Sequence, residues 1–396
     1  MNLLLCFFAW WAYQNFGLLG VLMFPTMMMA MLYFRQNTML YVNTMKSYQA
    51  QPPRFNMPDY EEVWLTTRDG VRIFAWLIRG PRPAEAPTMM FFHGNAGTIA
   101  ERLPNAEGLI KHTGCNLLLV EYRGYGTSGG DPTEAGLLAD GQAALDHLRG
   151  RKDIDTDNLL VFGRSLGGAV AIALAHANEG ALRGMIVENT FTSIREMAGA
   201  LFPFLAVLPD AWFEALLDNH WHSDEIIGAL RLPSLFLAGK QDEIVPPPQM
   251  VKLWDRLRGA GEPPQHSAFV PFPAGKHNDT WTLPGYYAPI ARFLRAAAKP
   301  GTAKGGGATE PPEKEPEEEK REETDHDGWT RMSAEGEEGD TTPSPLEILS
   351  DAAIGDMSVQ QLRSSLAKRK VAHGHCVEKA ELVELLRDTQ SQSRLS

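Results

Sequence analysis

The sequence predicts an α/β domain in which a mostly parallel β-sheet is covered by helices on both faces. From about residue 60 onward, short apolar runs alternate with amphipathic segments of helical length, and this alternation is typical of a parallel sheet. The apolar runs are continuous, without a polar residue at every second position. Continuous runs are expected of strands that are buried on both faces.

The first two expected strands form a hairpin. Residues 63–66 and 71–78 are apolar and aromatic segments separated by the turn Arg68-Asp69-Gly70, which is a typical hairpin pattern. The strands expected after the hairpin are 89–92, 117–120, 159–162, 184–187, 234–238 and 268–270, and the expected helices are 100–112, 133–149 and 166–177. Functional groups in such sheets collect beyond the carboxyl ends of the strands, so a site is expected in the loops that follow them.

Composition excludes several classes of protein. The 396 residues are 44% hydrophobic and 22% charged, close to the average for globular proteins. Cys6, Cys115 and Cys376 lie far apart, which excludes a disulfide scaffold and a cysteine-rich zinc module. The formal net charge of −12 argues against a broadly basic nucleic-acid-binding protein.

The N-terminal segment predicts a single-pass membrane anchor over residues 1–40. Residues 1–34 contain no charged side chain, and about 20 apolar residues are enough to span a bilayer. Tyr13 and Tyr33 are separated by about 30 Å of helix, as in the aromatic belts of membrane helices. A cleaved signal peptide is the alternative, but the basic n-region and the small-residue cleavage site are missing. Basic residues follow the span and none precedes it, which favours a cytosolic location for the next domain.

The strongest functional pattern is Gly163-Arg164-Ser165-Leu166-Gly167-Gly168, which follows an expected buried strand and precedes an alanine-rich segment. A G-x-S-x-G sequence at a strand–turn–helix corner is typical of a nucleophile elbow, with Ser165 as the nucleophile. Glycine is needed on both sides because a Cβ there would collide with the neighbouring strand or helix. The alternative role for Ser165 is a helix N-cap.

A nucleophilic serine needs a base and an orienting acid, in the chain order Ser, Asp, His for this type of turn. Asp242 follows the expected strand 234–238, and His277 follows the strand that ends near Val270. Both residues therefore lie at carboxyl ends of strands, and we expect His277 as the base and Asp242 as the acid. Glu188 is the alternative acid, in which case Asp242 would be an ordinary turn residue.

Acyl transfer also needs hydrogen-bond donors for an oxyanion. The N–H of Leu166 follows the nucleophile directly, and a second N–H is expected from the loop after the strand 89–92. That loop reads His93-Gly94-Asn95-Ala96-Gly97, so Asn95 is the second candidate donor, whereas His93 is expected to shape the loop. The alternative is a plain strand-to-helix turn. No metal and no organic cofactor is required by this chemistry.

Five segments in this order carry a resemblance to a known family. They are His93-Gly94-Asn95-Ala96-Gly97, Glu121-Tyr122-Arg123-Gly124-Tyr125-Gly126-Thr127-Ser128, Gly163-Arg164-Ser165-Leu166-Gly167-Gly168, Val187-Glu188-Asn189-Thr190-Phe191 and Lys276-His277-Asn278-Asp279-Thr280-Trp281. Over residues 55–298 the chain resembles the alpha/beta-hydrolase family, and in particular its Bem-type branch. The resemblance implies the alpha/beta-hydrolase fold, with a small helical cap at about 192–230.

The resemblance also implies a function. Members of the family are described as single-pass membrane proteins and predicted serine hydrolases, and related branches include protein depalmitoylases. The family triad falls on Ser165, Asp242 and His277. Glu121 is a departure, because relatives usually carry aspartate there, but it is not a triad position. The family implies a type II membrane arrangement, which conflicts with the charge bias after the anchor.

The cap region is apolar and aromatic, with Phe202, Phe204, Trp212 and Phe213 among its residues. An insert of this kind above the serine favours an acyl-chain or lipid-like substrate. The equally good alternative is that these side chains only pack the cap onto the core.

Two further segments follow the domain. Residues 299–345 are rich in Gly, Pro and Glu and predict a disordered acidic linker. Residues 346–390 regain helical periodicity and resemble a SAP-like helix–loop–helix module. Nucleic-acid binding is not favoured because the charges in this tail cancel, so a protein partner is expected for it.

The first hypothesis is a membrane-anchored serine hydrolase that cleaves acyl ester or thioester bonds by a Ser-His-Asp acyl-enzyme mechanism. The alternative is a catalytically silent hydrolase-fold scaffold that recruits partners through the C-terminal module. Transacylase or haloperoxidase-like chemistry on the same triad is a third hypothesis.

Overall fold

The computed structural model describes residues 10, 13–17, 27, 30–31, 33–43, 50–202, 214–259 and 261–297. The chain divides into two compact units, Met1–Thr309 and Glu310–Ser396, and the second lies outside the described residues. The expected linker and SAP-like module therefore lie outside them, as does most of the expected anchor. Among the residues described, none of the helices has both the length and the apolar character that crossing a bilayer requires.

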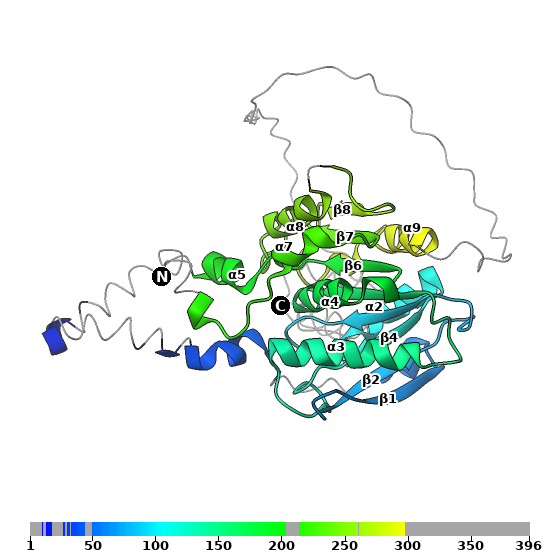
Figure 1. The fold of residues 1–396 in the computed structure, drawn as a ribbon, viewed down its shortest axis with the longest axis horizontal. Coiled ribbons are helices and arrows are strands. Elements are labelled where there is room, and N and C mark those ends of the chain that lie inside the picture. Colours follow the sequence, from blue (N-terminus) through cyan, green and yellow to red (C-terminus); the bar gives the residue numbers. More distant parts are fainter. Residues whose placement is uncertain are drawn as a thin grey trace, which may run out of the picture. The chain divides into compact units, whose positions relative to one another are not determined.

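The described residues form one eight-stranded β-sheet (Figure 1). Its strands are β1 (Tyr60–Thr66), β2 (Arg72–Ile78), β3 (Thr88–Phe92), β4 (Asn116–Val120), β5 (Leu159–Arg164), β6 (Gly184–Glu188), β7 (Ser234–Gly239) and β8 (Ala268–Phe272). They lie in the order β1-β2-β4-β3-β5-β6-β7-β8. β2 pairs antiparallel with β1 and β4, and all the other pairs are parallel. The prediction of a mostly parallel sheet is confirmed.

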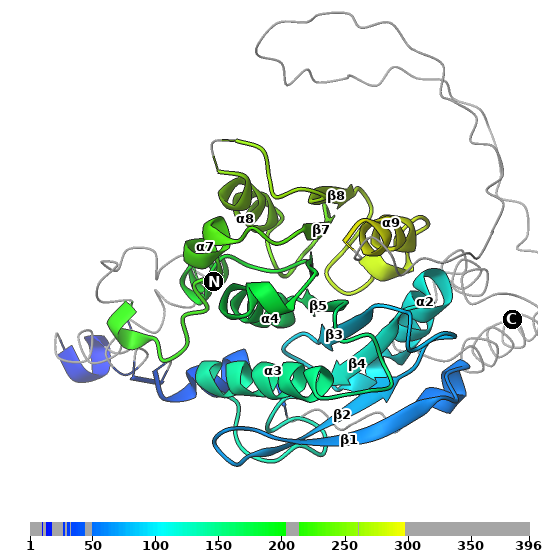
Figure 2. The ribbon, with the colours of Figure 1, turned by 45° about the vertical axis from the view of Figure 1, so that its right-hand side comes forward.

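Helices cover both faces of this sheet (Figure 2). They are α2 (Leu103–Thr113), α3 (Glu134–Arg149), α4 (Leu166–Ala177), α5 (Ile194–Leu201), α7 (Ser223–Ile226), α8 (Pro248–Arg258) and α9 (Tyr287–Ala297), with 3-10 helices at Pro52–Phe55, Ile99–Arg102, Glu179–Ala181, Ile227–Ala229 and Thr280–Thr282. α2 and α9 pack on one face, and α3, α4 and α8 pack on the other.

Burial on both faces explains why the central strands carry runs of consecutive apolar residues. In β3, Met89 and Phe91 belong to the core on the α2 and α9 side, whereas Met90 and Phe92 belong to the core on the α3 and α4 side. All four side chains are buried. Burying a side chain of this size contributes roughly 1.5–3 kcal/mol, so a polar residue at any of these four positions would lower stability.

The observed helices differ from the expected ones in two places. The expected helix 100–112 begins as the 3-10 turn Ile99–Arg102 and becomes α2 only at Leu103. A proline lies in the first turn of α2, where its missing N–H would have no partner in a helix anyway. α9 was not among the expected elements, although it is amphipathic and buries Ile290 and Phe293 against the sheet.

Main chains approach most closely where β5 passes into α4. A Cβ at Gly163 would overlap the carbonyl oxygen of Gly167, and a Cβ at Gly167 would overlap the carbonyl oxygen of Phe92 on the neighbouring strand. The expectation that glycine is needed on both sides of Ser165 is therefore confirmed, and its reason is contact with main-chain atoms that cannot rotate away.

We expect Gly167→Ala to lower the free energy of unfolding by at least about 1–3 kcal/mol, because an overpacked main chain has to shift. Chemical denaturation followed by circular dichroism measures this change. Gly180→Ala is the matched control, since no atom lies within 4 Å of a Cβ built there, and its effect should stay within about 0.5 kcal/mol. Equal stability of the two variants would contradict the packing account.

Candidate active site

Ser165 lies in a sharp turn between β5 and α4. Its φ of 54° and ψ of −120° fall in a region that residues other than glycine rarely adopt, at a cost of the order of 1–3 kcal/mol. The Ser165 N–H donates a hydrogen bond to Glu188 O at 2.9 Å, and Thr190 Oγ1 donates one to Ser165 O at 2.7 Å. The segment at the end of β6 thus holds the strained turn in place.

Ser165, His277 and Asp242 form a chain of close polar contacts. His277 Nε2 lies 3.1 Å from Ser165 Oγ, and His277 Nδ1 lies 2.7 Å from Asp242 Oδ2. All three residues are buried. Asp242 Oδ1 accepts hydrogen bonds from the N–H groups of Ile244 and Val245 at 2.9 and 2.8 Å, which orient the carboxylate. In this geometry an imidazole can take the proton of a serine while a carboxylate holds the ring.

Glu188, the alternative acid, has a different partner. Tyr286 Oη donates a hydrogen bond to Glu188 Oε2 at 2.6 Å, and burial raises the pKa of the Glu188 carboxyl. The carboxylate beside the His277 imidazole is that of Asp242, whereas the main-chain N–H of His277 donates to Glu243 Oε2 at 3.3 Å. Arg164, whose charge attracts Glu188, donates to His277 O at 2.5 Å. Arg164 therefore supports the loop of His277, and Glu188 lies beside Tyr286 instead of the imidazole.

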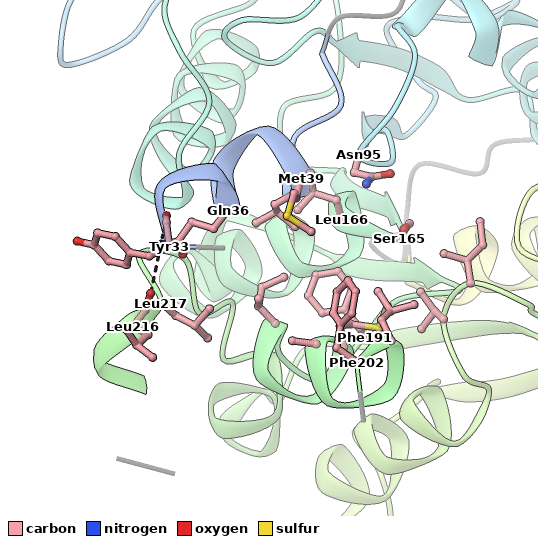
Figure 3. A pocket seen from close by; sticks show the side chains of 17 residues that line it. Tyr33, Gln36, Met39, Asn95, Ser165, Leu166, Phe191, Phe202, Leu216 and Leu217 are labelled. Atoms are coloured by element: carbon pink, nitrogen blue, oxygen red, sulfur yellow. Dashed lines mark hydrogen bonds between the residues drawn. The ribbon is translucent and has the colours of Figure 1, made fainter. Parts of the chain in front are cut away.

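The candidate oxyanion donors lie beside Ser165. Asn95 and Leu166 line the same cavity as Ser165 (Figure 3). Within the described residues, neither of their backbone N–H groups donates to another main-chain or side-chain group. The loop lies close to the serine, since a Cβ built at Gly94 would lie 3.5 Å from Ser165 Cβ, in ordinary van der Waals contact. Both amides are thus available to a bound group.

Two tyrosines to which no sequence pattern gave a role hold the candidate oxyanion loop. Tyr122 Oη donates to His93 O at 2.9 Å, and Tyr125 Oη donates to Asn95 O at 2.8 Å. Both follow the carboxyl end of β4, the neighbour of β3 in the sheet. This position after a strand is the sequence feature from which a role near the site could have been predicted. His93, expected to shape the loop, is fully buried, with Nε2 3.2 Å from Glu121 Oε1.

Asn189 connects the loops that carry the base and the acid. Its Nδ2 donates to the carbonyl oxygens of Lys276 and His277 at 3.1 and 3.2 Å, and its Oδ1 accepts from Gly239 N at 2.8 Å. Gly239 ends β7, shortly before Asp242. One side chain at the end of β6 therefore positions both partners of the imidazole–carboxylate pair, a role that the sequence did not reveal.

An apolar cavity of about 290 Å³ opens at Ser165 (Figure 3). Its walls come from the helical residues 33–40, from α5 and from the pairs 216–217 and 244–245. Most of these side chains are aliphatic or thioether, such as Met39. The arrangement can accommodate a hydrocarbon chain with one end at the serine oxygen.

The end of the expected anchor, residues 33–40, and the residues after it contact the site directly. The helical residues 33–40 lead to Val42, whose N–H donates to Asn95 O at 2.9 Å. Tyr41 is buried, and its Oη donates to Asn219 Oδ1 at 2.7 Å. The N-terminal segment is therefore bound both to the candidate oxyanion loop and to the cap.

The chain is similar in sequence to several known proteins. The family described as serine aminopeptidase, S33, matches residues 84–226. Alpha/beta hydrolase domain-containing protein WAV2 of Arabidopsis thaliana is 42% identical over 68% of this chain and 90% of its own length. Protein bem46 of Schizosaccharomyces pombe is 40% identical over 66% of this chain and 87% of its own length. An uncharacterized membrane protein of Saccharomyces cerevisiae is 32% identical over 72% of this chain and 97% of its own length.

Among solved structures, the Pyrococcus furiosus esterase Pf2001 is similar with a TM-score of 0.52 and 18% sequence identity. The match covers 63% of this chain and 97% of that chain. At this level of identity the likeness shows a shared fold alone.

We expect Asn189→Ala to slow the reaction of Ser165 with a fluorophosphonate by about 10–100-fold, because a misplacement of about 1 Å in a reacting group has that effect. The rate of covalent labelling measures it. Asn178→Ala is the matched control, since its amide also donates two hydrogen bonds, to Gln142 Oε1 and Leu174 O, but ties α3 to α4. The same loss of rate in both variants would contradict a positioning role.

Proposed function

The chain belongs to the alpha/beta-hydrolase family, and from this premise we propose that it is a membrane-anchored serine hydrolase that cleaves acyl ester or thioester bonds. The observation that carries the proposal is the contact chain from Ser165 through His277 to Asp242 at the mouth of an apolar cavity. A serine, a base and an acid in contact are what nucleophilic acyl transfer requires.

In the first step, His277 takes the proton of Ser165 as the serine oxygen attacks the acyl carbonyl carbon. The negative charge that develops on the carbonyl oxygen is stabilised by the N–H groups of Leu166 and Asn95. Asp242 holds the imidazole and stabilises its protonated form. His277 then gives the proton to the departing alcohol or thiol, and the acyl group stays on Ser165.

In the second step, a water molecule loses a proton to His277 and attacks the acyl-enzyme. The acid is released, and the proton returns to Ser165. The same residues act in both steps, and neither step needs a metal ion or an organic cofactor.

The apolar lining of the cavity supports the proposal that the substrate carries an acyl chain. One wall of the cavity is formed in part by residues 33–40, which begin at the end of the uncharged stretch 1–34 and continue beyond it. A hydrocarbon chain that leaves a membrane next to this segment would meet an apolar surface that leads to Ser165. Lipids and acylated proteins both offer such a chain.

Two observations support association with a membrane. The uncharged stretch 1–34 has the length that an anchor needs, and the similar protein of Saccharomyces cerevisiae is named a membrane protein. The segment 33–43 joins this stretch to the catalytic domain by hydrogen bonds to Asn95 and Asn219, so the anchor and the site would be held in a defined relation.

Ser165→Ala and Asp242→Asn should each lower kcat/KM for p-nitrophenyl octanoate and for an octanoyl thioester by about 10⁴-fold or more, because the nucleophile or the correct imidazole tautomer is lost. His277→Ala should act similarly. Circular dichroism spectra identical to that of the native protein serve as the control for folding.

Hydrolysis at the native rate by Ser165→Ala would contradict the mechanism. A folded native protein that cleaves neither substrate and leaves a fluorophosphonate unreacted would favour the scaffold hypothesis, with residues 346–390 as the partner-binding segment.

The acyl-chain dependence tests the role of the cavity. Each buried methylene contributes about 0.8 kcal/mol, so kcat/KM should rise about fourfold per methylene until the cavity is full. Ala198 lines the cavity, so the larger side chain of Ala198→Trp should occupy part of it. In this variant kcat/KM should stop rising at a shorter acyl chain. Val251→Trp is the control, because Val251 is exposed on α8 and does not line the cavity. An unchanged chain-length profile in Ala198→Trp would contradict the acyl-chain assignment.

A further inference from the structure

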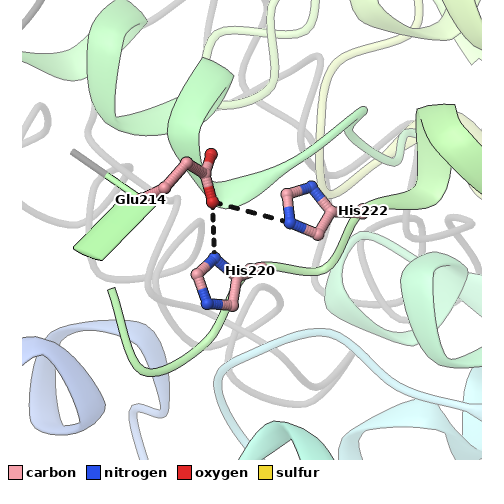
Figure 4. A group of neighbouring side chains, drawn as sticks. All are labelled: Glu214, His220 and His222. Carbon is pink, nitrogen blue, oxygen red and sulfur yellow. Dashed lines mark ion pairs between the residues drawn. The ribbon is translucent and has the colours of Figure 1, made fainter. Parts of the chain in front are cut away.

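A second cluster of chemically active side chains lies in the cap, away from the triad. It consists of Glu214, His220 and His222 (Figure 4). One ligand atom of each residue lies within 4.8 Å of the others. Glu214 Oε2 is 2.8 Å from His220 Nδ1 and 3.6 Å from His222 Nε2. The acyl-transfer mechanism uses none of the three.

The backbone places the two imidazoles side by side. Trp221 between them has a φ of 48°, and it is buried, with Nε1 donating to Tyr41 Oη at 3.3 Å. Turning this residue into the core leaves His220 and His222 on the outer side, with ring centroids 5.1 Å apart and planes at 11°. The N–H groups of His220 and Trp221 both donate to Glu134 Oε2, so the histidine segment is fixed before any ligand binds.

We propose that Glu214, His220 and His222 bind a Zn²⁺ ion. Two imidazole nitrogens and one carboxylate oxygen are a ligand set that zinc commonly takes, with a water molecule as the fourth ligand. His220 Nδ1 is buried and, although close to Glu214, makes no hydrogen bond of good geometry within the described residues. A buried imidazole nitrogen beside a carboxylate oxygen, without a hydrogen bond of good geometry, is in a position from which both groups can bind one metal ion.

The surroundings of His222 provide a second feature of zinc sites. Its other nitrogen, Nδ1, lies 3.6 Å from Glu225 Oε1. Histidines that bind metals usually turn their second nitrogen toward a carboxylate or a carbonyl group, which sets the tautomer and orients the ring. At 3.6 Å the two groups are within the range of an ion pair but are not hydrogen-bonded, so within the proposal Glu225 would position His222 by closing this short gap.

The ion would stabilise the wall of the acyl cavity. Glu214 belongs to the same short helical segment as Leu216, which lines the cavity and accepts a hydrogen bond from Gln36 Nε2 at 3.2 Å. His220 and His222 belong to the segment bound to Glu134. Zinc would tie these two parts of the cap together and so hold the contact between cap and N-terminal segment.

Equilibrium dialysis of the untagged, full-length protein in detergent against buffered Zn²⁺, with elemental analysis, tests the proposal. We expect one Zn²⁺ per chain, and Co²⁺ in its place should give the visible absorption of a four-coordinate ion. Glu214→Gln, His220→Ala and His222→Ala should each abolish the stoichiometric binding. Glu225→Gln should weaken it by about 10–100-fold.

Two controls separate this site from other ligands in the chain. His176→Ala changes an exposed histidine of α4 and should leave zinc binding unchanged. The sequence also carries His373, His375 and Cys376 close together, and a variant with all three changed to Ala should still bind one ion.

Three results would overturn the proposal: no stoichiometric zinc in the native protein, undiminished binding in the conservative variant Glu214→Gln with a native circular dichroism spectrum, or loss of binding in the variant of the C-terminal residues. Because the readout is bound metal, it is independent of whether Ser165 is a nucleophile.

Discussion

The close passage of β5 into α4 is the constraint on which the rest of the site depends. Two glycines, Gly163 and Gly167, allow main chains to touch where side chains would prevent it, and only then can Ser165 adopt its strained turn. The strain, of the order of 1–3 kcal/mol, is sustained because the end of β6 binds the turn through Glu188 O and Thr190 Oγ1. A buried sheet thus holds the side-chain oxygen of Ser165, the proposed nucleophile, at the edge of a cavity.

The parallel topology brings the other groups to that oxygen. Asn95 follows β3, Asp242 follows β7 and His277 follows β8, and parallel strands end at one edge of the sheet. Asn189, at the end of β6, ties the acid and base loops together. Above this edge the helical residues 33–40 and the cap enclose an apolar space. The polar side chains therefore lie at one end of a cavity whose apolar walls can accommodate a hydrocarbon chain.

The sequence predicted the parts of this structure that local patterns encode. The strands were found because burial on both faces makes them continuously apolar, and Ser165, Asp242 and His277 were expected together because each follows such a strand; the structure places them in contact. Contacts between distant segments carry no local pattern. The hydrogen bond from Val42 to Asn95 joins the segment after the expected anchor to the candidate oxyanion loop, and no periodicity could reveal it. α9 was not predicted for a related reason. The role of its apolar face becomes apparent only when the helix is seen packed against the sheet.

Peptide mass spectrometry of the protein quenched in acid during turnover of a long-chain acyl ester tests the central claim most directly. The account predicts that the acyl mass is found on the peptide that contains Ser165, because the elbow serine carries the acyl group between the two steps. Turnover of the ester with no acyl group on Ser165, or with the acyl group on another residue, would contradict it.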